Sequence, residues 1–312
     1  MAKVILITGA TGKQGGALID ALLSQKSEDF TILAVTRDVS GSPAQKLRSR
    51  SHFIKLVQGD LDEVPVLFKE AQSVAGQPIW GVYSVQVSMG KGVTSEGEIR
   101  QGKALIDESI KAGIKHFVYS SVERGGDDAS WDNPTPIPHF RTKYEIEHHL
   151  RNTTLPGKSG ENMSWTILRP VAFMDNLTLG FPTKVFISAL HNWLENKPVQ
   201  WVAIKDIGIF AAQAFTDPKK WEHKAVGLAG DELNFDAMSH AFKSVTGEPA
   251  PAAYSIFGSI LTFMLSEMRV MISWFASDGY HADIEARRAD HPQLLTFVEW
   301  LIQESPFENA EW

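Results

Sequence analysis

The stretch Gly9-Ala10-Thr11-Gly12-Lys13-Gln14-Gly15 decides the fold, because it joins an apolar run, Val4–Thr8, to a helical pattern that follows it. Glycines between a strand and a helix let the backbone approach a pyrophosphate closely, and the helix N-terminus offers free N–H groups and a partial positive charge. The alternative interpretation is an ordinary tight turn. We predict that the turn binds a dinucleotide, with these residues as its candidates: Gly9, Thr11, Gly12, Lys13, Gln14 and Gly15.

Short runs of β-branched and aromatic residues alternate with helical patterns through the first half of the chain. Six strands are predicted, at Val4–Thr8, Thr31–Thr36, Phe53–Val57, Ile79–Ser84, His116–Ser120 and Trp165–Leu168. The helical patterns between them are Gly16–Ser24, Val64–Ala75, Ser95–Ala112 and Pro138–Arg151. This alternation is typical of the α/β class and predicts a Rossmann-type doubly wound parallel sheet.

Beyond Pro170 the alternation fades and helical patterns predominate. They cover Phe181–Glu195, Asp206–Phe215, Phe235–Thr246, Tyr254–Ala276 and Gln293–Gln303, with short strands expected between them. We therefore expect a Rossmann domain over residues 1–170. A smaller helix-rich C-terminal domain over residues 171–312 would serve a substrate or a partner, with some of the chain crossing between the two.

The overall composition excludes several classes of function. Lys+Arg 30 against Asp+Glu 37 gives a net charge of −7, which disfavours direct nucleic-acid binding. The chain has no cysteine, so disulfides, Cys-ligated zinc and iron–sulfur clusters are excluded. No apolar stretch reaches the ~20 residues of a membrane span, and His148-His149 has no further ligand at metal spacing, so neither a membrane nor a metal is expected. We expect a cytoplasmic protein, with the nucleus as an open alternative.

Residues at the ends of the predicted strands supply further cofactor-binding candidates. Arg37 stands where an acidic residue would bind the ribose 2′-hydroxyl of NAD, and an arginine there suits the 2′-phosphate of NADP instead. Asp38 is the competing candidate for a hydroxyl, and a solvated surface side chain is the plain alternative for Arg37. The other candidates also have ordinary interpretations as turn or core residues: Asp60, Leu61, Val85, Gln86, Ser120, Pro170, Val171 and Phe173.

Seven segments together resemble the NmrA-like proteins, a family within the atypical short-chain dehydrogenases. They are GATGKQGG at Gly9–Gly16, VTRD at Val35–Asp38, GDLDE at Gly59–Glu63, QGKALIDESIKAGIKHFVYSS at Gln101–Ser121, PHFRTKYEIE at Pro138–Glu147, TILRPVAFMDN at Thr166–Asn176 and WFASDGYHADI at Trp274–Ile284. The resemblance covers nearly the whole chain. It implies a Rossmann domain that holds NADP(H), with a cleft between this domain and the smaller one.

The resemblance also directs attention to Lys143 and His139 as catalytic candidates. Typical short-chain dehydrogenases use a Tyr-x-x-x-Lys pair, in which the tyrosine passes a proton. Here Lys143 is present but His139 stands four residues before it, while Tyr144 points to a different helix face. A histidine can transfer protons near neutral pH. The alternative is that Lys143 holds the nicotinamide ribose and His139 has no role.

Two functions remain open. The first is a regulator that binds NADP(H), changes conformation with redox state and contacts a protein partner such as a transcription factor, as the resemblance implies for some members. The second is an NADPH-dependent reductase of a hydrophobic quinone, enone or ketone. Its substrate pocket would be lined by Phe173, Met174, Trp274, Phe275 and Tyr280.

Overall fold

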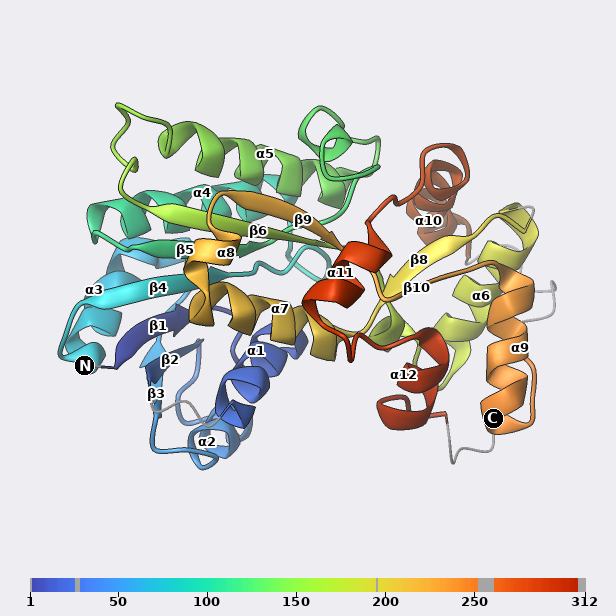
Figure 1. Ribbon diagram of the computed structural model, residues 1–312, viewed down its shortest axis with the longest axis horizontal. Coiled ribbons are helices and arrows are strands. Elements are labelled where there is room, and N and C mark those ends of the chain that lie inside the picture. The colour runs from blue at the N-terminus through green and yellow to red at the C-terminus, as the bar shows by residue number, and fades with distance from the viewer. Residues whose placement is uncertain (1, 26–28, 195, 252–260, 308–312) are drawn as a thin grey trace. The chain divides into compact units, whose positions relative to one another are not determined.

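The computed structural model describes residues 2–25, 29–194, 196–251 and 261–307 (Figure 1). The chain folds into two compact units, and each unit is assembled from separate stretches of sequence. The first comprises Met1–Ser121, Thr142–Arg169 and Lys205–Val226; the second comprises Val122–Arg141, Pro170–Ile204 and Gly227–Trp312. The chain therefore passes between the units several times.

A seven-stranded sheet has the strand order β3-β2-β1-β4-β5-β6-β9. The neighbours from β3 to β6 pair in parallel, and consecutive strands run outward in both directions from β1, so the predicted doubly wound Rossmann fold is confirmed. The strands are β1 (Lys3–Ile7), β2 (Phe30–Thr36), β3 (Ile54–Gln58), β4 (Ile79–Ser84), β5 (His116–Ser120), β6 (Ser164–Pro170) and β9 (Lys224–Leu228).

Helices cover both faces of this sheet, which explains why its strands are apolar runs without alternation. Val4–Ile7 of β1 are at most 1% exposed. Figure 1 shows α4 and α5 on one face and α1 and α7 on the other. The helices that accompany the sheet are α1 (Lys13–Ser24), α2 (Ser42–Arg48), α3 (Val64–Ala75), α4 (Ser95–Lys111), α5 (Pro138–Thr153), α7 (Ile204–Thr216) and α8 (Pro218–Trp221).

The predicted strand count was wrong, because the sheet has β9 in addition to the six predicted strands. The sequence of β9 is Lys-Ala-Val-Gly-Leu, and lysine, alanine and glycine are all depleted in strands. Strand β9 and helix α2 were not placed near the sheet from the sequence. Both are short, so neither gives a clear periodic pattern. Helix α7 lies in the first unit apart from its first residue, Ile204.

The second unit is rich in helices, as predicted. A small sheet has the order β10-β8-β7, made of β7 (Ala172–Phe173), β8 (Val199–Val202) and β10 (Asp231–Leu233). The helices are α6 (Phe181–Trp193), α9 (Phe235–Thr246), α10 (Leu261–Ser277), α11 (Ile284–Asp290) and α12 (Phe297–Gln303). Residues 252–260 of the predicted helix Tyr254–Ala276 lie outside the described residues. In the described part of the chain, no helix has both the length and the apolar character that crossing a membrane requires.

Close packing of α7 on α1 depends on Gly208. A Cβ at this position would lie 2.4 Å from the carbonyl carbon of Ala17, and backbone cannot move aside as a flexible side chain can. We expect Gly208→Ala to lower the free energy of unfolding by about 1–3 kcal/mol, measured by urea denaturation. The matched control is Gly16→Ala in α1, where the nearest atom is 3.8 Å away and alanine favours the helix. Equal stabilities of the two variants would contradict this account.

Candidate functional site

The carboxyl ends of β1 and β4 are joined by Thr8. Its hydroxyl donates to the carbonyl oxygens of Tyr83 and Val85, each at 3.1 Å, and accepts from the N–H of Val85 at 2.9 Å. The strand order changes direction at this point, and ligands of open α/β sheets bind outside the carboxyl ends of the strands at such a point. The turn after β1 is therefore in the position expected of a binding site.

The glycines of this turn allow backbone to approach backbone. Gly9 has φ +60°, and a Cβ there would lie 2.8 Å from Cγ1 of Val85. A Cβ at Gly15 would lie 2.3 Å from the carbonyl oxygen of Gly9, so only glycine fits. Gly12 begins α1 without a side-chain cap, and the first turn of the helix contains no acidic residue. The N-terminus of α1 carries a partial positive charge and therefore suits an anion, and Thr11 and Lys13 are exposed beside it.

Gln14 is held from within the first unit. Its Oε1 accepts a hydrogen bond from Ser120 Oγ at 2.6 Å and from the Tyr83 hydroxyl at 3.5 Å. Burial raises the pKa of Tyr83, which keeps that hydroxyl protonated as a donor. The Ser120 hydroxyl therefore orients Gln14, an arrangement that the sequence did not indicate.

Gln86 provides a buried polar atom that suits a ligand. Its Nε2 donates to Ser84 Oγ at 2.9 Å, whereas its Oε1 is buried and has no hydrogen-bond partner in the described part of the protein. Buried acceptors are rarely left without a donor. A hydroxyl of a bound cofactor is a fitting donor, because Gln86 and Val85 directly follow β4.

After β2, the acidic and basic candidates behave differently. Both Arg37 and Asp38 are exposed, but Asp38 Oδ1 accepts from the hydroxyl and the N–H of Ser40 at 2.6 and 2.9 Å. These hydrogen bonds from Ser40 hold the pKa of Asp38 below its usual value. Asp38 thus stabilises its own turn.

After β3, Asp60 likewise has a structural role. It caps a short 3-10 helix, Leu61–Glu63, by accepting a hydrogen bond from the N–H of Asp62 at 3.0 Å.

Lys143 is buried in an ion pair with Glu98. Lys143 Nζ lies 2.6 Å from Glu98 Oε1, and the two side chains are 8% and 1% exposed. Glu98 also accepts from Ser88 Oγ at 2.9 Å and from Thr142 Oγ1 at 2.7 Å. A lysine ammonium has three N–H donors, so two remain for a ligand.

Glu98 was not predicted from the sequence, because an acidic residue in the first turn of a helix is commonplace. A signal was nevertheless present. Glu98 shares one buried face of α4 with Gly102, Leu105 and Ile106. Gly102 marks where α4 lies closest to α5, since a Cβ there would lie 2.5 Å from Cδ1 of Ile146. An acidic residue one helical turn before such a glycine lies on the same face of α4 and therefore faces α5 as well.

The remaining helix candidates lie on α5. His139 is half-buried in the first turn, with its ring edge-to-face on Phe140 at 4.9 Å between centroids. It stands one turn before Lys143, as the spacing predicted. The ring of Tyr144 is tilted by 46° against that of His148, with 4.2 Å between the ring centroids.

His139 lies within Val122–Arg141 and so belongs to the second unit, as do several other predicted residues. Val171 is buried and its N–H donates to Leu228 O at 3.2 Å, while Phe173 pairs with Val202 in the small sheet. Pro170 ends β6. Their role toward a cofactor stays a prediction. Of the residues predicted to line a substrate pocket, all but Phe173 are at most 8% exposed: Met174, Trp274, Phe275 and Tyr280. Their role in lining a substrate pocket also stays a prediction.

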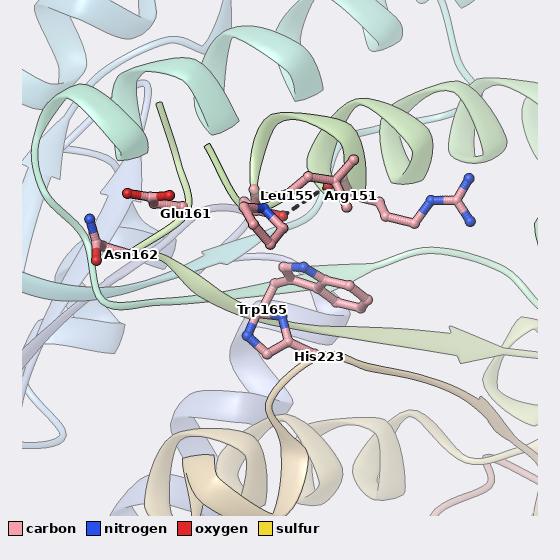
Figure 2. Close-up of a pocket in the computed structure, with 8 residues that line it drawn as sticks. Arg151, Leu155, Glu161, Asn162, Trp165 and His223 are labelled. Atoms are coloured by element: carbon pink, nitrogen blue, oxygen red, sulfur yellow. Dashed lines mark hydrogen bonds between the residues drawn. The ribbon is translucent and has the colours of Figure 1, made fainter. Parts of the chain in front are cut away.

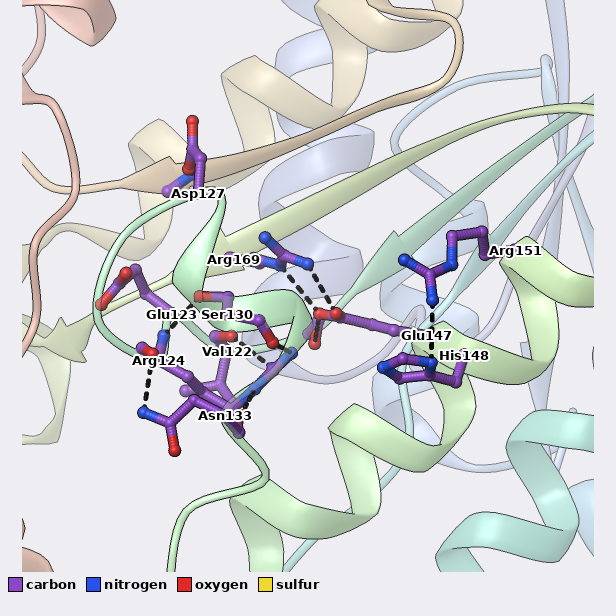
Figure 3. Close-up of polar contacts among 12 residues, drawn as sticks. Val122, Glu123, Arg124, Asp127, Ser130, Asn133, Glu147, His148, Arg151 and Arg169 are labelled. Carbon is purple, nitrogen blue, oxygen red and sulfur yellow. Dashed lines mark hydrogen bonds and ion pairs between the residues drawn. The ribbon is translucent and has the colours of Figure 1, made fainter.

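Two further buried polar groups have structural roles (Figure 3). Glu147 faces Arg169, and the pair is fully buried, with Arg169 Nη2 at 2.8 Å from Glu147 Oε2 and Nε at 3.1 Å from Oε1. In the second unit, Arg124 donates to the carbonyl oxygens of Val122, Ser130 and Asn133 at 2.7–3.0 Å. This arginine holds the loop around it together.

A hollow of about 440 Å³ lies at the opposite edge of the sheet from the glycine turn (Figure 2). Trp165, near the amino end of β6, meets His223 edge-to-face at 5.5 Å between ring centroids, with Leu155 beside them. Because β1 and β6 run in the same direction, this hollow is separate from the candidate site.

The sequence matches the model of the NmrA-like family over residues 1–301. The chain belongs to the NmrA-like family. One relative, the NmrA-like family domain-containing oxidoreductase lnaB of Aspergillus flavus, is 29% identical over 272 residues, which cover 80% of this chain and 74% of the relative.

Solved structures of a regulator and of a reductase have the same fold. NmrA, a negative transcriptional regulator in complex with NAD, superposes with a TM-score of 0.71 at 20% identity, covering 98% of this chain and 96% of NmrA. The triphenylmethane reductase of Citrobacter sp., complexed with NADP(H), gives a TM-score of 0.70 at 17% identity, covering 96% and 99%. A regulator and a reductase thus share the architecture, so the fold alone does not decide between the two functions.

The buried ion pair of Lys143 and Glu98 leads to a testable prediction about stability. Glu98→Gln keeps the shape of the side chain but removes the charge that balances Lys143, so we expect the free energy of unfolding to fall by about 3 kcal/mol. Glu98→Gln combined with Lys143→Met should recover much of this loss. The control is Glu96→Gln, an exposed position on the same helix turn, which should change stability by less than about 0.5 kcal/mol. Similar losses for Glu98→Gln and Glu96→Gln in urea denaturation would refute the pairing.

Proposed function

We propose that this protein binds NADP(H) at the turn between β1 and α1. The open N–H groups of α1 suit the pyrophosphate, and the contacts of Gly9 and Gly15 leave no room for side chains there. Crystal structures of NmrA with NAD and with NADP, and of a reductase with NADP(H), support a nicotinamide dinucleotide.

Each candidate then has a distinct task toward the cofactor. Arg37 binds the 2′-phosphate, since the Asp38 carboxylate is engaged by Ser40. Lys143 directs its two remaining N–H donors to ribose hydroxyls, and Gln86 Oε1 accepts from a hydroxyl. When bound, the cofactor supplies hydride chemistry.

We further propose that the protein acts as a redox-sensing regulator through contacts with a protein partner, such as a transcription factor. The observation that carries this proposal is the buried ion pair of Lys143 and Glu98. Carbonyl reduction needs a proton for the developing alkoxide. The tyrosine of the usual pair is replaced by His139, and Lys143 is already engaged in a buried ion pair with Glu98. The usual Tyr-x-x-x-Lys arrangement for passing a proton is therefore not formed by these residues.

An NADPH-dependent reductase of a hydrophobic quinone, enone or ketone is the second candidate. The observation in its favour is the naming of several relatives as oxidoreductases, at 24–29% identity. In this function Lys143 and His139 are the catalytic candidates, and the imidazole of His139 is the group that would take the place of the tyrosine.

Cofactor choice tests the nucleotide site. Arg37→Ala should weaken binding of NADP(H) by about tenfold or more and leave NAD(H) nearly unchanged, because only NADP(H) carries the phosphate that a guanidinium binds. Isothermal titration with all four nucleotides measures this. Lys46→Ala on α2, which also removes an exposed cation, is the control and should affect neither. Equal losses for NADP(H) and NAD(H) would place the phosphate elsewhere.

Turnover separates the two functions. The unmodified protein with NADPH should show negligible oxidation of the cofactor with quinones, enones and ketones, while Lys143→Ala weakens nucleotide binding. His139→Tyr, which restores the Tyr-x-x-x-Lys spacing on α5, should raise turnover if a substrate can enter. Absorbance at the NADPH band follows the reaction. Robust oxidation by the unmodified protein, lowered ~10²–10⁴-fold by His139→Ala, would establish the reductase instead.

A further inference from the structure

A groove follows the edge strand of the seven-stranded sheet. Strand β3 ends the strand order, so it has β2 on one side only. The groove has a volume of about 680 Å³, within the range of sites that hold ligands. Its floor is β3 itself, through Ile54, Lys55, Leu56 and Gln58, and its walls come from side chains of α2 and α3.

The hydrogen bonds between β2 and β3 show which backbone groups face the groove. Ile32 N–H donates to Phe53 O, and Gly59 N–H donates to Thr36 O, both at 2.9 Å. In a parallel ladder, alternate residues of a strand bond to the same neighbour. The residues of β3 that bond to β2 are therefore the odd-numbered ones, in phase with positions 53 and 59.

Lys55 and Val57 are in phase with these positions and direct their backbone groups toward β2. Leu56 and Gln58 are out of phase, so their N–H and C=O groups point into the groove. No hydrogen bond to these outward groups occurs within the described chain, and no strand covers them. Such a row of open donors and acceptors is what an extended peptide needs to add as another strand.

The charges around the groove favour an acidic occupant. Arg48 at the end of α2 and Lys55 in the middle of β3 are exposed cations, and His52 lies beside them. Glu70 of α3 is the acidic side chain among the lining residues. The groove is therefore positive on balance, although the whole chain carries a net charge of −7.

The same charges argue against a second copy of this chain as the occupant. Pairing β3 with β3 of another copy would bring Lys55 and Arg48 close to their own counterparts. A lysine on an edge strand is a common device against such self-association. An acidic peptide meets no such repulsion.

We propose that β3 takes up an extended acidic segment of a partner protein as an added strand. The N–H and C=O groups of Leu56 and Gln58 pair with the peptide backbone, and Arg48 and Lys55 bind its carboxylates. This surface extends the function proposed above by naming where a protein partner docks, and it does not depend on nucleotide binding.

Amide hydrogen exchange tests the backbone pairing directly. The probe is a short peptide that alternates valine and glutamate. Its addition should slow exchange at the N–H groups of Leu56 and Gln58 and leave those of Lys55 and Val57 unchanged, because the latter already bond to β2. Binding that changes none of these amides would overturn strand addition in favour of a purely electrostatic contact, and no binding at millimolar peptide would overturn the proposal altogether.

Two substitutions at one position separate backbone from side chain. Gln58→Pro removes the outward N–H without touching the bonds to β2, since proline is tolerated on an edge strand when its nitrogen faces outward. It should weaken peptide binding about tenfold in fluorescence anisotropy, whereas Gln58→Ala should leave binding nearly intact. Equal effects would contradict backbone pairing. If Gln58→Pro fails to fold, the exchange experiment on the unmodified protein still decides.

Charge reversal tests the choice of partner. Combining Arg48→Glu and Lys55→Glu should abolish binding of the glutamate peptide and create binding of its lysine counterpart, while Lys46→Glu, outside the groove, should change neither. NADP(H) affinity should be unchanged by the double variant, so failure here leaves the nucleotide proposal intact. A dimer in sedimentation that Gln58→Pro dissociates would show that a second copy is the occupant and overturn the proposal.

Discussion

The close approach of Gly15 to Gly9 is the constraint on which the candidate site depends. At 2.3 Å from the Gly9 carbonyl oxygen, a Cβ at Gly15 would force α1 away from the end of β1. Without that contact, the open N–H groups of α1 would not stand at the carboxyl edge of the sheet, and Gln14 would not reach Ser120 of β5. One missing methyl group thus links the turn, the helix and a strand more than a hundred residues away in sequence.

The pair of Glu98 and Lys143 shapes the site in a different way. Gly15 acts through the absence of a side chain, whereas this pair places charged side chains in the protein interior. A buried ion pair contributes little net stability compared with apolar residues of similar size, and it is costly only when broken. Its value is therefore better sought in what it positions. With Ser88 and Thr142 also bonded to Glu98, the ammonium of Lys143 is fixed in direction, and its remaining donors point away from the carboxylate.

The sequence predicted the fold well wherever one element carried its own signal. β4, β5, α3 and α9 begin and end where the pattern placed them, because buried apolar runs and amphipathic spacing are local properties. Short strands were expected between the later helices, but β9 was not assigned to the large sheet, because its residues disfavour strands and become one only by pairing at the edge of an existing sheet. The partners of Glu98 and of Gln14 were missed for a related reason: a hydrogen bond between residues 44 or 106 positions apart leaves no trace in local spacing that says which residues pair.

The two proposed surfaces use different groups of the same strands. Register pairs Thr36 of β2 with Gln58 of β3, so Arg37 follows one member of the pair and Asp60 stands two residues beyond the other. The nucleotide would be bound by side chains and helix N–H groups beyond the strand ends, whereas the peptide would be bound by backbone groups along the outer side of β3. Because β3 pairs with β2 through its inner groups only, a strand added outside leaves those bonds in place. The sheet can therefore present a cofactor site at its carboxyl edge and a partner site at its side without either displacing the other.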